Sequence, residues 1–167
     1  MKKATLFLAA LFIATNIFCQ NTNWPAWRGS NSDGVAPSGN PPTSWSETSN
    51  VKWVVDLPGK GHSTPVIWGN TIFVTSAADG EKQTPSSQVN SPLQFVIMAF
   101  DKNSGKELWK KVLAEEKPAE GSTHNDNSWA SNSPVTDGKH VYAYFGSRGL
   151  YCLDMQGNLV WSRNFGQ

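Results

Sequence analysis

Two polar clusters in the sequence carry side chains that could contact a ligand. His62 and Ser63 form the first, and the second is the run His124, Asn125, Asp126, Asn127 and Ser128. Imidazole, amide, carboxylate and hydroxyl groups offer hydrogen-bond donors and acceptors to a substrate or small ligand. Their spacing matches no metal-binding motif. The structural alternatives are a hydrogen-bonded histidine at a strand start and a turn stabilised by Asx hydrogen bonds.

Arg148, in the turn sequence Gly146-Ser147-Arg148-Gly149, is a further candidate. It could contact an anion, and the alternative is a solvated turn residue. The sequence contains no nucleophile elbow, phosphate-binding loop, HExxH or CxxC pattern. It therefore offers candidate ligand contacts and identifies no catalytic residue.

Two aspartates could be mistaken for a catalytic pair of carboxylates. Each is followed by a glycine and then a tryptophan, in the sets Asp101, Gly105, Trp109 and Asp154, Gly157, Trp161. Such an aspartate can accept hydrogen bonds from the backbone N–H groups of its own turn, and the glycine supplies a positive φ. We therefore expect the two aspartates to stabilise turns in separate repeats rather than to perform acid–base chemistry.

The tryptophans of this motif are expected to pack between sheets. Trp53 lies 56 residues before Trp109, and Trp161 lies 52 residues after it. A large aromatic at the same position of each repeat would fill the space between adjacent sheets. We therefore interpret these residues as packing residues and not as a stacking surface for sugars or bases.

The elements that must position these residues are short strands separated by turns. The patterns predict strands at Val51–Leu57, Ser63–Trp68, Thr71–Ser76, Gln94–Phe100 and Glu107–Leu113, and then at Ser131–Thr136, Lys139–Phe145, Leu150–Asp154 and Asn158–Arg163. Gly69-Asn70 and Asp137-Gly138 are hairpin turn signals. Ala78–Pro92 is predicted to be a long inserted loop.

The pattern repeats. Pro65-Val66-Ile67-Trp68-Gly69-Asn70 matches Pro134-Val135-Thr136-Asp137-Gly138-Lys139, and the aspartate–glycine–tryptophan motif recurs. Repeats of about 40–50 residues with four strands each are typical of β-propeller blades. The sequence therefore predicts an all-β protein in which residues 51–167 form about two four-stranded antiparallel blades.

Residues 20–50 precede the repeats and are rich in Asn, Ser, Gly and Pro. They also contain Trp24, Trp27 and Trp45, which is unusual for a disordered linker. We expect an ordered, irregular arm whose aromatic side chains pack onto the main body.

Residues 1–19 are predicted to be a secretory signal peptide. Lys2 and Lys3 form its basic region, and the apolar run from Leu6 to Ile13 is too short to span a bilayer. A lipoprotein signal acylated at Cys19 is the alternative, which Phe18 disfavours because that position usually takes a small side chain. The mature chain is expected to be secreted or periplasmic, with no transmembrane span and with Cys152 as a buried small apolar residue.

Net charge favours no polyanionic partner. The whole chain carries a formal charge of +1, and removal of Lys2 and Lys3 leaves 12 basic residues against 13 acidic ones. A near-neutral chain gives no electrostatic reason to bind nucleic acid.

At these residues the chain resembles the PQQ-like (pyrroloquinoline-quinone-like) β-propeller repeat proteins. The repeat signature Ala-x-Asp-x-x-Thr-Gly-x-x-x-Trp is matched from Ala99 to Trp109, with Ser104 in the Thr position, and less closely from Cys152 to Trp161. Trp24 to Gly29, Gly61 to Val66 and Asn127 to Ser131 are similar to segments of secreted bacterial members. The resemblance covers essentially all of the mature chain and implies a ring of seven or eight blades, of which this sequence holds about two. We therefore expect a partial chain that holds only the N-terminal part, with the remaining blades of the missing C-terminal part among its partners.

The resemblance implies two functions. The first is a binding or interaction scaffold for an envelope protein or a small-molecule ligand. The second is a quinoprotein oxidoreductase that holds PQQ and Ca²⁺, with its catalytic residues in blades outside this sequence. A carbohydrate hydrolase or lyase is a weaker third. The sequence has neither the adjacent cysteine pair nor a recognisable acid constellation of such dehydrogenases, so we expect the scaffold and leave the cofactor unassigned.

Overall fold

The computed structural model describes residues 22–36, 39–79, 91–119 and 122–166. The predicted signal peptide 1–19, with Cys19, lies outside the described residues. So do residues 80–90, which make up most of the predicted loop Ala78–Pro92, and residues 20–21 and 37–38 of the predicted arm.

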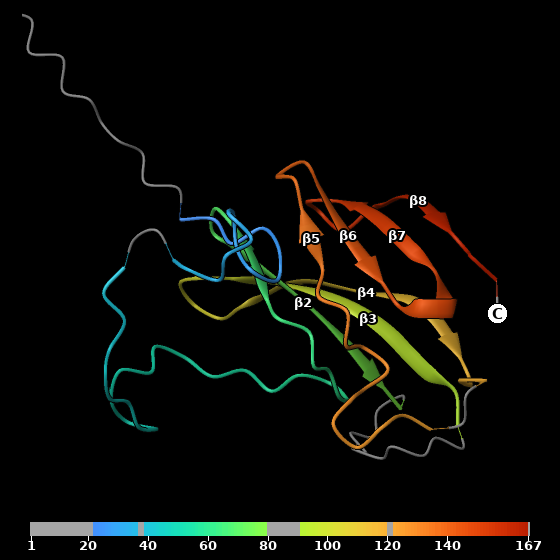
Figure 1. Cartoon of the computed structure of the whole chain (residues 1–167), viewed down its shortest axis with the longest axis horizontal. Helices are drawn as coiled ribbons and strands as arrows, with labels where there is room; N and C mark the ends of the chain where they lie inside the picture. The colour runs from blue at the N-terminus through green and yellow to red at the C-terminus, as the bar shows by residue number, and fades with distance from the viewer. Residues whose placement is uncertain (1–21, 37–38, 80–90, 120–121, 167) are drawn as a thin grey trace, which may run out of the picture.

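The first sheet contains four antiparallel strands in sequential order (Figure 1). They are β1 (Val66–Trp68), β2 (Thr71–Ala78), β3 (Leu93–Asp101) and β4 (Glu107–Glu116). Gly69-Asn70 turns β1 into β2 as predicted, with Trp68 opposite Thr71. The predicted strands Thr71–Ser76, Gln94–Phe100 and Glu107–Leu113 are confirmed, and each extends by one to three residues.

The second sheet repeats this order with β5 (Val135–Thr136), β6 (His140–Tyr144), β7 (Leu150–Asp154) and β8 (Leu159–Arg163). The connection from β6 to β7, predicted as a turn, contains a single 3₁₀ turn, η1 (Gly146–Arg148). Two four-stranded antiparallel meanders confirm the all-β fold and are consistent with two propeller blades.

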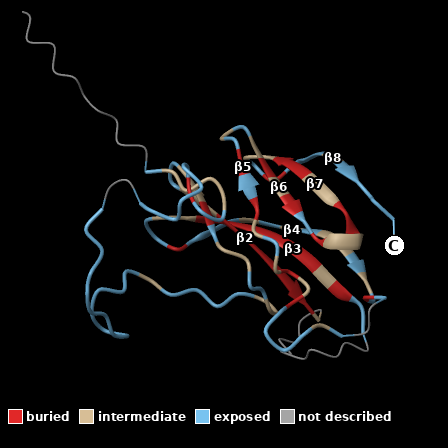
Figure 2. Ribbon diagram, in the orientation of Figure 1, coloured by how far each residue is buried: buried red, intermediate tan, exposed pale blue. Residues whose placement is uncertain are grey.

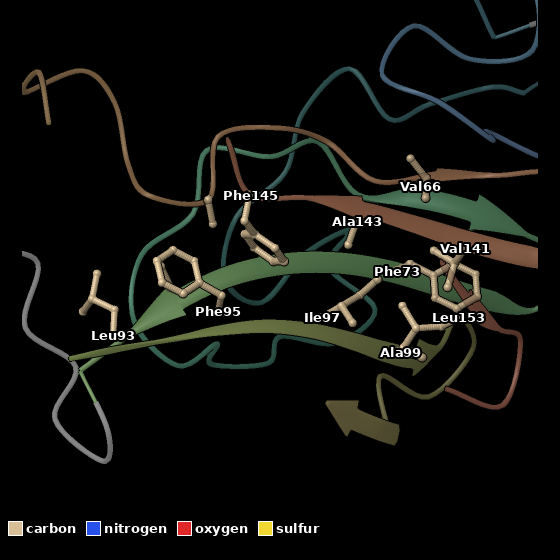
Figure 3. Close-up of a cluster of buried hydrophobic side chains, with 12 residues drawn as sticks. Val66, Phe73, Leu93, Phe95, Ile97, Ala99, Val141, Ala143, Phe145 and Leu153 are labelled. Atoms are coloured by element: carbon tan, nitrogen blue, oxygen red, sulfur yellow. The ribbon is translucent and has the colours of Figure 1, made fainter. Parts of the chain in front are cut away.

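The two sheets pack against each other through alternate side chains. Phe73, Phe95 and Ile97 of the first sheet lie in one buried cluster with Val141 and Leu153 of the second (Figure 3). The rings of Phe95 and Phe145 meet edge to face, with centroids 5.5 Å apart. Burying each large apolar side chain contributes about 1.5–3 kcal/mol. The buried residues concentrate on β2, β3, β6 and β7 (Figure 2).

Three predicted strands differ from the structure. Ser63–Trp68 is shortened to β1, Val66–Trp68. Val51–Leu57 forms no strand among the described residues, and Val54 is 79% exposed. Its alternating apolar pattern is genuine, but none of the described strands pairs with it. Ser131–Thr136 is reduced to β5, Val135–Thr136, because Ser131 and Ser133 use their hydroxyls in loop hydrogen bonds.

The arm pairs with β1 and β5, the first and edge strands of the two sheets, which we call the inner strands. Trp24 exchanges two backbone hydrogen bonds of 2.8 Å with Ile67 of β1, and the Thr136 N–H of β5 donates to the Pro25 carbonyl at 2.9 Å. The arm therefore satisfies edge groups that would otherwise be open to another chain.

The predicted packing of the arm's aromatic side chains onto the main body is contradicted for two of its three tryptophans. Trp24 lies against Gly29, whereas Trp27 is 66% exposed and Trp45 is 72% exposed. The prediction that all three tryptophans pack onto the main body was therefore wrong for Trp27 and Trp45.

Tryptophan side chains dock onto glycine turns of the sheet that follows. A Cβ atom on Gly105 would lie 2.7 Å from the Trp53 ring, and one on Gly157 would lie 2.7 Å from the Trp109 ring. The indole N–H of Trp53 donates to the Lys102 carbonyl and that of Trp109 donates to the Met155 carbonyl, each at 3.0 Å. These repeated contacts join each tryptophan to the next turn along the chain.

A further contact of the same kind joins the inner hairpins. A Cβ atom on Gly138, in the turn between β5 and β6, would lie 2.2 Å from the ring of Trp68 in β1. Only a residue without a side chain fits beneath each of these indoles. The glycines therefore allow both the backbone conformation of the turn and the close approach of the indole ring.

Within the described residues, no helix is long and apolar enough to cross a membrane.

Candidate ligand-binding site

An open hollow of about 610 Å³ lies between the arm and the loop that leads into β5. Its wall combines exposed aromatic rings with uncharged polar side chains: Ala26, Trp27, His62, Asn127, Ser131, Asn132, Ser133, Val135 and Tyr144. Loop and arm residues thus converge where the two inner strands β1 and β5 begin.

A second hollow of about 430 Å³ adjoins the first and shares Asn127, Ser131 and Asn132 with it. It is otherwise lined by Ser122, Thr123, His124, Ser128, Trp129, Phe145, Gly146, Ser147 and Arg148. Because three residues border both spaces, the two adjoining hollows together make up the candidate site.

Asn127 is held at the boundary between the hollows by a hydrogen-bonded turn. Its backbone N–H donates to the His124 carbonyl at 2.9 Å, and its Oδ1 accepts from the Ser128 N–H at 2.9 Å and from the Ser131 hydroxyl. The Ser131 hydroxyl contacts the Ser128 carbonyl as well, at 2.9 Å. Short polar side chains that bond to their own backbone build this loop.

The other residues of the second polar cluster differ in their position relative to the hollows. His124 lines the second hollow and Ser128 is buried beside it, whereas Asn125 and Asp126 line neither hollow. The Asp126 side chain is 93% exposed, and its carboxylate lies 3.8 Å from His124 Nδ1. The structure therefore places Asn125 and Asp126 on the solvent side of the turn.

The structure separates His62 from Ser63. The His62 N–H donates to the Ala130 carbonyl at 3.1 Å, and the side chain lines the first hollow. The Ser63 hydroxyl instead donates to the Thr75 carbonyl of β2 at 3.2 Å and borders a different hollow of about 310 Å³. Ser63 thus links the segment that precedes β1 to strand β2.

Arg148 is neither a solvated turn residue nor an open anion contact. Its side chain is 4% exposed, and Nε lies 3.0 Å from Oε1 of Glu116 at the end of β4. The guanidinium also sits over two rings, 5.4 Å from the Phe95 centroid and 5.3 Å from that of Trp129. Cation–π contacts and the ion pair therefore fix Arg148 in the wall of the second hollow.

The carboxylates of the turn motifs are committed to backbone donors. Oδ1 of Asp101 accepts from the Ser104 hydroxyl at 2.7 Å and the Ser104 N–H at 2.8 Å, and these bonds lower the pKa of Asp101. The Asn158 side chain and backbone lower the pKa of Asp154 in the same way. Neither residue lines the hollows. Their carboxylates are ionised caps of turns.

Trp27, Asn132 and Tyr144 line the first hollow and were missed by the sequence reasoning. Trp27 was expected to pack, and Asn132 and Tyr144 were assigned to strands. The available signal was the alternation of serine and asparagine from Ser131 to Ser133, which disfavours a strand.

The described walls of the hollows do not fit a quinone held with Ca²⁺. Calcium prefers six to eight oxygen ligands that include carboxylates, and no Asp or Glu lines either hollow. Among the described residues, no three His, Cys, Asp or Glu side chains gather where they could hold a metal ion.

Residues 93–167 match a PQQ-repeat family model described as "Outer membrane protein assembly factor BamB". No curated protein matches the chain. Among solved structures, a "Europium-containing methanol dehydrogenase" is similar at 20% identity with a TM-score of 0.31. That similarity covers 62% of this chain and 25% of the dehydrogenase chain, so this sequence spans a minor part of it.

The matched segment runs from β3 to the end of β8 and contains both aspartate–glycine–tryptophan motifs. Residues 93–167 therefore belong to the PQQ-like repeat family, and the two repeated four-stranded meanders are consistent with two propeller blades.

Proposed function

We propose that the protein is an exported PQQ-like propeller that acts as a binding scaffold, with the two connected hollows as its ligand site. The observation that carries this proposal is the wall they share, in which Asn127, Ser131 and Asn132 join spaces of about 610 and 430 Å³. Ligand sites in proteins have such volumes and combine aromatic surface with a few placed polar groups.

A buried donor beside the second hollow supports this proposal. Among the described residues, the buried indole N–H of Trp129 has no hydrogen-bond partner, and Trp129 lines the hollow. Buried polar groups are nearly always satisfied, so each exception requires an explanation. An acceptor atom on a ligand or an ordered water would supply the missing bond.

The scaffold's nearest partners are further blades of the same repeat. Trp53 docks on Gly105 without belonging to a described sheet, and Trp161 belongs to the second sheet without a described glycine turn beneath it. Trp161 pairs with Cys152 in register, as Trp109 pairs with Ala99. A preceding blade would supply the sheet to which Trp53 belongs, and a following blade would supply the glycine turn beneath Trp161.

We place the protein in the cell envelope or outside the cell. The predicted signal peptide and the assembly factor named by the matching family model support this location. Fractionation of the native host followed by N-terminal sequencing tests it. A mature terminus at Gln20 in the soluble periplasmic or secreted fraction is expected, whereas an unprocessed cytoplasmic chain contradicts it.

Mapping of ligands by NMR tests the site. A library of small molecules that spans sugars, nucleosides, amino acids, quinones and organic acids is titrated into the isotope-labelled full chain. At least one class should shift the side-chain amides of Asn127 and Asn132, and His62→Ala should weaken that binding. If no class perturbs these residues, the hollows are not a ligand site.

The quinoprotein alternative is tested in the same protein. PQQ with Ca²⁺ should leave the amides around the hollows unshifted; binding is the readout, because the catalytic residues of this alternative would lie in blades outside this sequence. Saturable PQQ binding at Asn127 or Asn132 would overturn the scaffold assignment in favour of the oxidoreductase.

A further inference from the structure

We propose that the first hollow binds a neutral carbohydrate, with the indole of Trp27 as the platform for a sugar ring. This inference rests on the function proposed above and specifies its ligand class. It is carried by an exposed aromatic ring on an anchored backbone, in a hollow whose lining includes hydrogen-bonding side chains and no Lys, Arg, Asp or Glu.

Trp27 stays exposed although the backbone on both sides of it is fixed. On one side Trp24 pairs with Ile67 and the Pro25 carbonyl accepts from Thr136; on the other the Gly29 N–H donates to the Ala26 carbonyl at 2.9 Å. The ring is nevertheless 66% exposed and lines the hollow. An indole held in place and left in water is a preformed apolar surface.

The polar groups opposite this ring have capacity left for a ligand. Within the described part of the chain, the His62 imidazole and the Asn132 carboxamide make no side-chain hydrogen bond, and both residues are exposed. Their backbones are anchored, since His62 donates to Ala130 and the Asn132 carbonyl accepts from the Thr75 hydroxyl. Asn127 uses its Oδ1 internally, so its amide N–H groups are the donors it can offer.

The charge of the wall selects the ligand class. No Lys, Arg, Asp or Glu lines the first hollow. Arg28 lies beside it, because its guanidinium sits over the Trp27 ring, 5.9 Å from the ring centroid, while its Nη2 donates to the Asp33 carbonyl. Apart from Arg28, which already donates to the Asp33 carbonyl, no Lys or Arg provides the counter-charge that a phosphate or carboxylate requires at this wall.

A neutral sugar fits this combination. One face of a pyranose ring presents C–H groups that pack on an aromatic surface, and its hydroxyls act both as donors and as acceptors. Carboxamides and an imidazole match the hydroxyls, while Trp27 and the exposed ring of Tyr144 provide aromatic surface. The volume of about 610 Å³ lies in the range of small-molecule sites.

Titration of the full chain with defined oligosaccharides tests the inference. Cellotriose, maltotriose and chitotriose serve as neutral probes and trigalacturonate serves as the anionic comparison, followed by calorimetry and by NMR of the indole and amide N–H groups. At least one neutral trisaccharide should bind and shift the Trp27 indole, and trigalacturonate should bind more weakly.

Two substitutions provide a matched comparison. Trp27→Ala should lower the association constant by about tenfold or more, because it removes the platform. Trp45→Ala removes an indole that is similarly exposed, at 72%, from the same arm outside the hollow, and should change the constant by less than about twofold. Asn132→Ala, which retains the backbone contact to Thr75, should also weaken binding without unfolding the chain.

The possible results separate this inference from the proposed function. If all neutral sugars fail while another class of compound shifts Asn127 and Asn132, the carbohydrate inference is overturned and the ligand site stands. If no compound perturbs the hollow, both are overturned. Equal losses from Trp27→Ala and Trp45→Ala would also overturn the inference.

Discussion

Glycine is required at positions 105, 138 and 157 by the indole that lies against each turn. A Cβ atom at these positions would come within 2.2–2.7 Å of the ring of Trp53, Trp68 or Trp109. All three glycines also have positive φ values, between 73° and 84°. Conformation and space therefore restrict these positions together, whereas an added Cβ atom at Gly39, Gly69, Gly146 or Gly166 would meet nothing within 4 Å.

Substitution of Gly157 separates these two requirements. Gly157→Ala should destabilise the chain by about 3 kcal/mol, because it combines the penalty of a positive φ with a clash against Trp109. Gly69→Ala has a comparable φ of 59° and nothing within 4 Å of the added Cβ, so it should lose only about 1 kcal/mol. Urea denaturation gives both values, and equal losses would show that the tryptophan contact is not close-packed.

The turn carboxylates predict acid sensitivity. Hydrogen bonds from the His140 and Lys139 backbone N–H groups, and then from the Tyr142 hydroxyl, hold the pKa of Asp137 well below its ordinary value of 3.8. The unfolded chain therefore takes up protons first as the pH falls below about 4. The stabilisation is complete above that pH and declines through the more acidic range.

Asp137→Asn should lower stability at neutral pH and flatten the fall in stability below pH 4. Thermal unfolding of the variant and the parent chain between pH 2 and 7 measures both effects. If the two chains lose stability with the same slope below pH 4, the turn carboxylate does not account for acid sensitivity.

At the scale of elements, hairpin signals and strand patterns in the sequence located most of the structure. Gly69-Asn70 and Asp137-Gly138 placed two turns, and alternating apolar residues placed β2, β3, β4, β6, β7 and β8. Val51–Leu57 has the same alternation yet forms no strand, because a strand requires a partner that the pattern cannot reveal.

The candidate site was harder to predict than the strands. Eight residues were recognised as polar candidates. Five of them line the two hollows, namely His62, His124, Asn127, Ser128 and Arg148, whereas Ser63, Asn125 and Asp126 do not. The ion pair of Arg148 with Glu116 and the exposure of Trp27 depend on contacts between distant segments. Local patterns carry no information about such contacts.

The arm is predicted to protect the inner strands. Trp24→Ala should accelerate hydrogen exchange of the Ile67 and Thr136 amides, because their acceptors lie on Trp24 and Pro25. Trp45→Ala, in an exposed part of the arm, is the control and should leave both amides unchanged. Unaltered protection in the Trp24 variant would mean that the backbone bridges do not depend on the packing of this indole against Gly29.

At the scale of the whole molecule, the two sheets are joined in three ways. Apolar side chains between them form one core, Trp68 and Trp109 dock on glycine turns, and Glu116 of the first sheet pairs with Arg148 of the second. The second sheet also presents Tyr142, Cys152 and Trp161 in register on its other face. This row corresponds to Phe73, Ala99 and Trp109, which face the second sheet.

Hydrogen exchange at the tryptophan indoles tests most directly whether consecutive repeats are joined by docking of tryptophan on glycine. The Trp53 and Trp109 indole N–H groups, which donate to carbonyls at 3.0 Å, should exchange slowly in the full chain, and that of the exposed Trp27 should exchange rapidly. Gly157→Ala should abolish the protection of Trp109 and leave that of Trp53 intact. Exchange of the Trp109 indole as fast as that of Trp27, or protection that survives Gly157→Ala, would contradict this account.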